Sequence, residues 1–168
     1  MTNRISSALG KVSDALSGVD PAQVGTACQM IADADTLGVY GCGREGYQMR
    51  GFTMRLFHMG QKVGQKVGYV GETTMPPLAS GAVFVVSSGP DDLSTVAAHI
   101  ATARAAGARV IVLTAQPVAP DTVSADLVLT VPAQTMTNDA QTSETDILPM
   151  GSVYEAALFF CANGSSPT

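Results

Sequence analysis

Five short apolar runs are the clearest feature of the chain, and none of them alternates apolar with polar positions. They cover residues 37–40, 67–70, 82–86, 110–113 and 127–131. A strand with one face in water alternates apolar and polar residues, whereas a strand covered on both faces does not. The runs therefore predict five strands of a sheet that is buried on both sides.

Helical periodicity separates most of these runs and also precedes the first of them. Asp20-Pro21 is typical of a helix N-terminus, because an aspartate caps the helix and proline suits the first helical position. Strands that alternate with helices predict a parallel sheet in a three-layer α/β/α sandwich, here with extra N-terminal helices. The predicted helices cover residues 5–19, 21–31, 47–59, 93–106 and 149–160.

Length and composition limit the class of protein. The chain has 168 residues, of which 46% are hydrophobic and 14% charged, and this suits one domain over residues 1–168. Nine Lys and Arg against fourteen Asp and Glu give a net charge of -5, so we expect no nucleic-acid partner and no anionic membrane partner. No apolar stretch approaches the ~20 residues of a spanning helix. We expect a soluble, cytoplasmic protein.

The cysteines predict neither a disulfide framework nor a zinc site. Cys28, Cys42 and Cys161 are odd in number and lie in no C-x-x-C spacing. We expect reduced thiols that pack against their neighbours, and no metal.

Three loops follow predicted strands and are therefore placed to bind a ligand, because open parallel sheets bind ligands beyond the carboxyl ends of their strands. The first loop has the G-x-G-x-x-G spacing of dinucleotide-binding turns. Such turns need an acidic residue about 20 residues further on to hold a ribose, and Glu72 lies well beyond that spacing. A dinucleotide enzyme is therefore not favoured. The loops are Gly41-Cys-Gly-Arg-Glu-Gly46, Gly71-Glu-Thr-Thr74 and Ser87-Ser-Gly-Pro-Asp-Asp92.

Two segments extend this minimal pattern. Gly60-Gln-Lys-Val63 is repeated at once as Gly64-Gln-Lys-Val67, which we interpret as a neutral lengthening of a connection. Residues 132–146 are polar and have no periodicity, so they are a candidate lid or subunit arm.

Five further segments, spread over nearly the whole chain, match one known family. They are Gly41-Cys-Gly-Arg44, Met54-Arg-Leu-Phe-His-Met-Gly60, Val70-Gly-Glu-Thr-Thr74, Gly107-Ala-Arg-Val-Ile111 and Leu148-Pro-Met-Gly-Ser-Val-Tyr-Glu155. Together they resemble the sugar isomerase (SIS) domain family, and within it the 6-phospho-3-hexuloisomerases. The resemblance implies a five-stranded parallel sheet with flavodoxin-like strand order, a homotetramer and no cofactor, and we expect a homo-oligomer that is a dimer or a tetramer. It also implies interconversion of 3-hexulose 6-phosphate and fructose 6-phosphate through an enediol.

The resemblance further implies which residues carry the chemistry. Glu155 matches the family's catalytic base and His58 its histidine. Moving a carbonyl along a sugar requires removal of a C–H proton and protonation of the carbonyl oxygen, which a carboxylate and an imidazole can share. A solvated helix carboxylate and a packing histidine are the alternative interpretations. The candidate substrate-binding residues are Gly43, Arg44, Glu45, Glu72, Thr73, Ser87, Ser88, Gly89, Asp91 and Ser94.

The loop after the third strand departs from the family's pattern. The family has Ser-Gly-Ser-Gly-Glu-Thr-Thr-Ser, whose hydroxyls and N–H groups surround a phosphate, and this chain has Ser88-Gly-Pro-Asp-Asp-Leu-Ser-Thr95. Pro90 removes an N–H donor, and Asp91 adds a negative charge. In the first loop Glu45 stands where the family has serine. These changes predict repulsion of a phosphate.

Three hypotheses for the function remain open on the sequence. The first is a sugar-phosphate isomerase that uses Glu155 and His58. The second keeps this pair but acts on a non-phosphorylated polyol or an amino sugar. The third is a non-catalytic SIS module that senses a sugar phosphate or serves in assembly. Retention of the catalytic pair favours an enzyme, and the apolar residues 156–160 favour a homo-oligomer.

Overall fold

The fold is a parallel sheet with helices on both faces. The computed structural model describes residues 3–58, 65–90, 93–116, 124–135, 148 and 151–164. All strand pairs are parallel, and the order β2-β1-β3-β4-β5 confirms the flavodoxin-like prediction. The strands are β1 (Thr36–Gly41), β2 (Lys66–Tyr69), β3 (Ala82–Ser87), β4 (Arg109–Thr114) and β5 (Leu127–Thr130).

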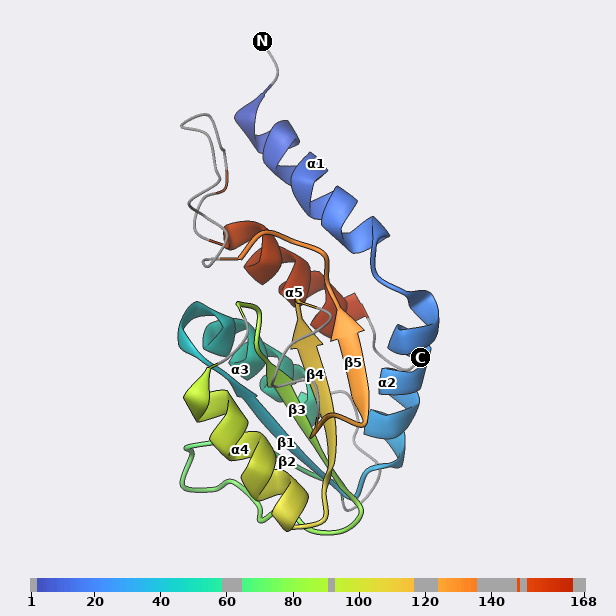
Figure 1. Cartoon of the computed structure of the whole chain (residues 1–168), viewed down its shortest axis with the longest axis vertical. Coiled ribbons are helices and arrows are strands. Elements are labelled where there is room, and N and C mark those ends of the chain that lie inside the picture. The colour runs from blue at the N-terminus through green and yellow to red at the C-terminus, as the bar shows by residue number, and fades with distance from the viewer. Residues whose placement is uncertain are drawn as a thin grey trace.

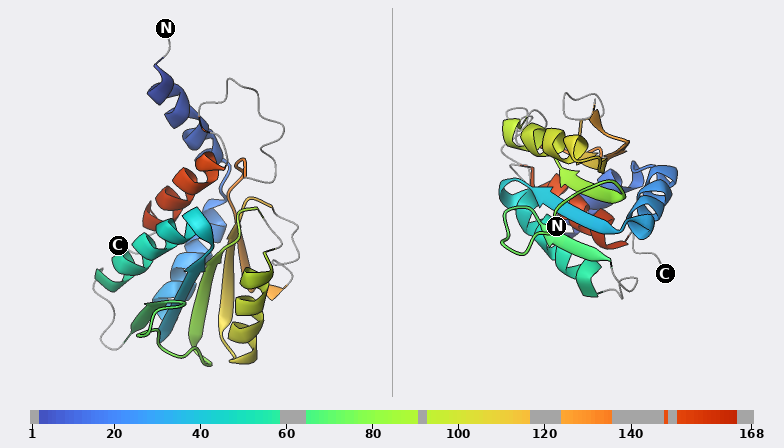
Figure 2. Two further views of the ribbon diagram at one scale, coloured as in Figure 1. Left: turned by 90° about the vertical axis from the view of Figure 1, so that its left-hand side faces the viewer. Right: turned by 90° about the horizontal axis from the view of Figure 1, so that it is seen from below.

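Both faces of the sheet are buried, as the lack of alternation predicts. Successive residues of a strand point to opposite faces, and on β3 Val83 and Val85 join one hydrophobic cluster while Phe84 and Val86 join the other. The helices α2 (Pro21–Asp33), α3 (Gly43–His58) and α5 (Ser152–Gly164) cover the first face, and α4 (Ser94–Ala105) covers the second (Figure 2, left).

The N-terminal helix α1 (Arg4–Ser17) packs on α5 and extends beyond the rest of the molecule (Figure 1). Its apolar side is covered at Val12 and Ala15, but Ile5 and Leu9 are exposed. The next helix begins as the sequence predicts, because the Asp20 side chain accepts a hydrogen bond from the N–H of Ala22 at 2.8 Å.

Helix α3 differs from the prediction in its start. It begins at Gly43 rather than near residue 47, so Arg44 and Glu45 lie in its first turn and not in a loop. Apolar periodicity could not reveal this turn because its side chains are polar. The segment at Gly60–Gly64, Asp91 and the greater part of the polar excursion, residues 136–146, lie outside the described residues.

Candidate active site

The turn between β1 and α3 places the candidate residues Gly43 and Arg44 at the carboxyl edge of the sheet. Gly43 has a φ of +53°, which glycine adopts readily. The hydroxyl of Tyr69 on β2 donates to the carbonyl of Gly41 at 2.6 Å and accepts from its N–H at 3.3 Å. A Cβ added at Gly46 would lie 2.6 Å from the Gly41 oxygen. Close backbone approach and the Tyr69 clamp therefore fix the start of α3.

Glu155 and Arg44, far apart in the sequence, meet at this edge. Glu155 lies in the first turn of α5, its side chain is 17% exposed, and its Oε1 is 2.9 Å from Arg44 Nε. Burial raises the pKa of Glu155, and the charge of Arg44 opposes this shift without cancelling it. Glu155 is therefore a paired carboxylate that holds a proton more readily than an ordinary glutamate does, which suits a general base near neutral pH.

Glu45 is the most deeply buried carboxylate of the described residues and lies at the ends of β1 and β3. Its side-chain Oε2 accepts hydrogen bonds from the Ser87 hydroxyl at 2.5 Å and from the Gly89 N–H at 3.1 Å. Burial raises the pKa of Glu45, and the nearby charge of Glu155 adds to the shift; the two hydrogen bonds and Arg44 act in the opposite direction. The structure thus joins three sequence candidates, Glu45, Ser87 and Gly89, in one cluster.

Tyr154 belongs to this cluster, and the sequence prediction missed it. Its side chain is 1% exposed, and its hydroxyl lies 3.1 Å from Ser87 Oγ. Burial and then the charge of Glu45 raise the pKa of Tyr154. A Cβ at Gly89 would lie 2.5 Å from the Tyr154 ring and 2.7 Å from Glu45 Oε1, so glycine is required there. An apolar helix gives no sign that one of its tyrosines faces a polar cluster.

His58 does not reach the site within one chain. It is exposed at the last residue of α3, whereas Arg44 is in the first turn of the same helix. At a rise of 1.5 Å per residue, the two ends of this helix are separated by about 22 Å. The structure therefore separates the two residues that the resemblance pairs in catalysis, Glu155 and His58.

The remaining candidates lie on both sides of this cluster. Glu72 and Thr73 follow β2, on the other side of β1 from Ser87, and Glu72 Oε1 accepts a hydrogen bond from Arg50 at 2.8 Å. Ser88 is buried directly after β3, and Ser94 begins α4. A cavity of about 320 Å³ opens beside the β1–α3 turn between the ends of β1 and β2.

Other kinds of site find no support among the described residues. No group of three His, Cys, Asp or Glu residues there could hold a metal ion. Cys28, Cys42 and Cys161 are not joined in disulfide bonds. Within the same part of the chain, no helix has the length and apolar character that crossing a bilayer demands.

Comparison with known proteins identifies the family. No family model matches the chain. A protein of Mycobacterium gastri named 3-hexulose-6-phosphate isomerase is 34% identical over 159 residues, which are 95% of this chain and 77% of the relative. The chain belongs to the 3-hexulose-6-phosphate isomerase family.

Solved structures show the same fold in this family and beyond it. A Methanococcus jannaschii protein, whose structure was described as inferring a 3-hexulose-6-phosphate isomerase function, is 24% identical with a TM-score of 0.77 over 94% of this chain and 85% of its own. NanR of Vibrio vulnificus, solved with ManNAc-6P, is 16% identical with a TM-score of 0.71 over 96% of this chain and 58% of its own. The chain thus shares its fold with a protein solved in complex with another sugar phosphate.

Proposed function

We propose that the protein is a sugar-phosphate isomerase that interconverts 3-hexulose 6-phosphate and fructose 6-phosphate without a cofactor. The observation that carries this proposal is the half-buried Glu155 carboxylate, held at the carboxyl edge of the sheet by Arg44. Membership of the isomerase family supports a phosphorylated substrate over a free or amino sugar, and an enzyme over a sensing module.

The proposed reaction moves one proton between neighbouring carbons. Glu155 removes the C2 hydrogen of 3-hexulose 6-phosphate, the C3 carbonyl oxygen gains a proton, and an enediol forms. The C2 hydroxyl then loses its proton, and Glu155 returns a proton to C3, which leaves the carbonyl at C2. Negative charge develops on the two oxygens during these steps, and the guanidinium of Arg44 lies where it can stabilise that charge.

The second acid–base group, His58, must come from another copy of the chain. Both groups have to touch the same two sugar carbons and their oxygens, and the ends of α3 are about 22 Å apart in one chain. Large apolar side chains are exposed along α3, namely Tyr47, Met54 and Phe57. We therefore propose that α3 packs against a second copy and brings His58 to that copy's Glu155.

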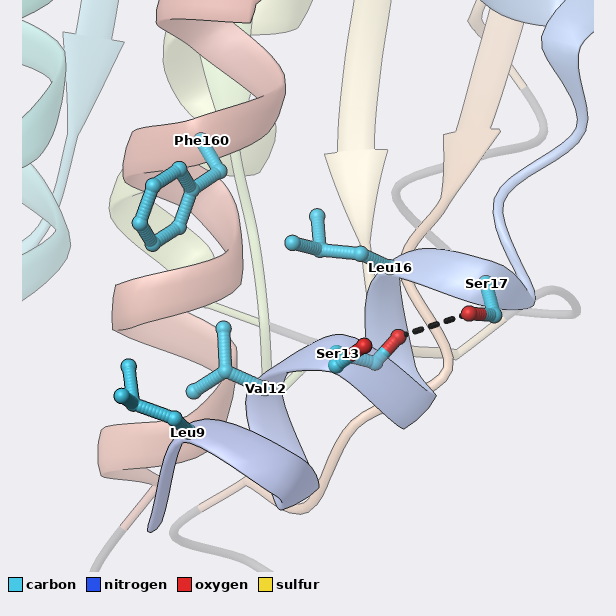
Figure 3. Close-up of a pocket in the computed structure, with 6 residues that line it drawn as sticks. All are labelled: Leu9, Val12, Ser13, Leu16, Ser17 and Phe160. Atoms are coloured by element: carbon cyan, nitrogen blue, oxygen red, sulfur yellow. Dashed lines mark hydrogen bonds between the residues drawn. The ribbon is translucent and has the colours of Figure 1, made fainter. Parts of the chain in front are cut away.

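Other exposed apolar surface fits the same homo-oligomer. A groove of about 370 Å³ is lined by residues of both α1 and α5 (Figure 3), and Phe159 and Phe160 on α5 are exposed. Its lining residues come from both helices: Leu9, Val12, Ser13, Leu16, Ser17 and Phe160. Two apolar surfaces, on α3 and on α1 with α5, allow a dimer to pair again into a homotetramer.

Phosphorylated sugars do not cross membranes unaided, so we place the protein in the cytoplasm. The net charge of -5 argues against a nucleic-acid partner.

A direct assay tests the proposal. The purified protein is incubated with 3-hexulose 6-phosphate, and formation of fructose 6-phosphate is followed. Glu155→Gln keeps the shape of the side chain but removes the base, so kcat should fall by about 10²–10⁴-fold. Asp33→Asn, at the exposed end of α2, removes a carboxylate elsewhere and should leave kcat unchanged. Full turnover by Glu155→Gln would exclude this residue as the base, and no turnover by the wild type would exclude the proposed reaction.

A further inference from the structure

The end of β3 has the properties of an anion-binding position. The Ser87 hydroxyl and the Gly89 N–H both point at one acceptor, Glu45 Oε2, at 2.5 and 3.1 Å. Helix α4 begins shortly afterwards, its N-cap Leu93 makes no side-chain capping bond, and its first turn contains no acidic residue. Converging donors near a helix N-terminus at the carboxyl edge of a parallel sheet favour a negatively charged group.

The anion that accepts these two hydrogen bonds is a side chain of the protein itself, the Glu45 carboxylate. Glu45 is 9% exposed, and its position in the first turn of α3 gives it the favourable end of a second helix dipole. Gly89 has no side chain, so its backbone approaches both Glu45 and Tyr154 closely. The carboxylate is therefore built into the cluster.

We propose that Glu45 is a specificity-determining residue that fills the anion position of the site, so that Ser87 and Gly89 can hold a substrate phosphate only when the Glu45 carboxyl carries a proton. This inference rests on the phosphorylated substrate proposed above. A charged Glu45 occupies the donors and repels a dianion, whereas a neutral carboxyl releases them and can donate its own O–H to a phosphate oxygen.

The surrounding charges make this dependence on protonation strong. On α3 itself the charged neighbour of Glu45 is Arg44, which lies against Glu155. From α5, Glu155 adds a like charge, and Tyr154 stays neutral because its pKa is raised by burial. The end of β3 contributes Ser87, which does not titrate. Two carboxylates thus share one guanidinium, so a bound dianion favours the uptake of a proton by Glu45.

Titration calorimetry with fructose 6-phosphate in two buffers of different ionisation enthalpy measures that proton directly. At pH 8 a phosphate monoester is a dianion, since its second pKa is about 6. The wild type should take up about one proton per ligand bound, and its Kd should rise about tenfold per pH unit on the alkaline side. Glu45→Gln keeps an acceptor for Ser87 and Gly89 but has no charge, so its proton uptake at pH 8 should vanish and its Kd should vary little with pH.

Matched variants separate this role from a structural one. Asp33→Asn removes one negative charge elsewhere and should keep the proton uptake of the wild type. If Glu45→Gln does not fold, the same comparison is made with Glu45→Ser, which introduces the serine that the family has at this position.

The outcomes distinguish the two proposals. Binding and turnover by the wild type without proton uptake at pH 8, or equal uptake in the wild type and Glu45→Gln, would overturn the role of Glu45 and leave the isomerase intact. Failure of all forms of the protein to bind fructose 6-phosphate would overturn both.

Discussion

The contact between Arg44 and Glu155 affects the pH range in which the proposed base can work. The pKa of Glu155 is raised by burial, and Arg44 restrains that shift. Because kcat/KM rises as the free enzyme's base loses its proton, the acid limb of the pH profile reports this pKa. The limb should therefore lie above the ordinary glutamate value of about 4.3.

Arg44→Gln should move this acid limb to higher pH. Removal of a neighbouring positive charge destabilises the Glu155 carboxylate, which raises its pKa. Glu155 then keeps its proton up to a higher pH, and activity rises only at that higher pH. The measurement is kcat/KM against pH for both proteins. Arg104→Gln is the matched control, because Arg104 on α4 pairs with Asp126, away from the β1–α3 turn. A limb that stays in place in Arg44→Gln would show that Arg44 does not act on the base.

The individual residues of the site were only partly predictable. Glu155 and Arg44 could be found because each matches a family motif, and Glu45 because it replaces a serine. The sequence could not show that Glu45 turns inward to Ser87, since that depends on where the start of α3 lies relative to the end of β3. Tyr154 gave no signal because a buried tyrosine looks like any other apolar residue of a helix.

At the scale of elements, the strands and the start of α2 were predictable, but the start of α3 was not. Unbroken β-branched runs occur only where both faces are covered, so the pattern of residues 82–86 and 110–113 identifies β3 and β4. The start of α3 is set instead by close approach of Gly41 and Gly46 and by the Tyr69 hydroxyl, contacts between segments far apart in the sequence.

Two glycines of α3 should respond in opposite ways to alanine. At Gly46 a Cβ would meet the Gly41 oxygen at 2.6 Å, so Gly46→Ala should lower the free energy of unfolding by about 1–3 kcal/mol and reduce kcat/KM. At Gly51 an added Cβ would meet no atom within 4 Å apart from its own helix backbone and chain neighbours, so Gly51→Ala should raise the free energy of unfolding by about 0.5–1 kcal/mol. Denaturant titration measures both, and equal effects at the two positions would contradict this account of the turn.

At the scale of the whole molecule, a single chain separates the proposed catalytic pair and leaves large apolar side chains exposed. His58 and Glu155 are separated by the length of α3, while Tyr47, Met54 and Phe57 on that helix are exposed. The resemblance to the family indicated both catalytic residues and a homo-oligomer. It could not indicate the arrangement that we propose, in which the two groups come from different copies, because a sequence motif carries no information on distance.

Mixing two inactive variants tests directly whether the working site of this isomerase is shared between copies. Glu155→Gln and His58→Asn should each be inactive alone in the conversion of 3-hexulose 6-phosphate. Unfolding and refolding them together in equal amounts gives mixed pairs, in which one site has lost both groups and the other has lost neither. Random pairing makes half of the pairs mixed, so activity should recover to about a quarter of the wild type. Mixed oligomers that form and remain inactive would contradict the shared site.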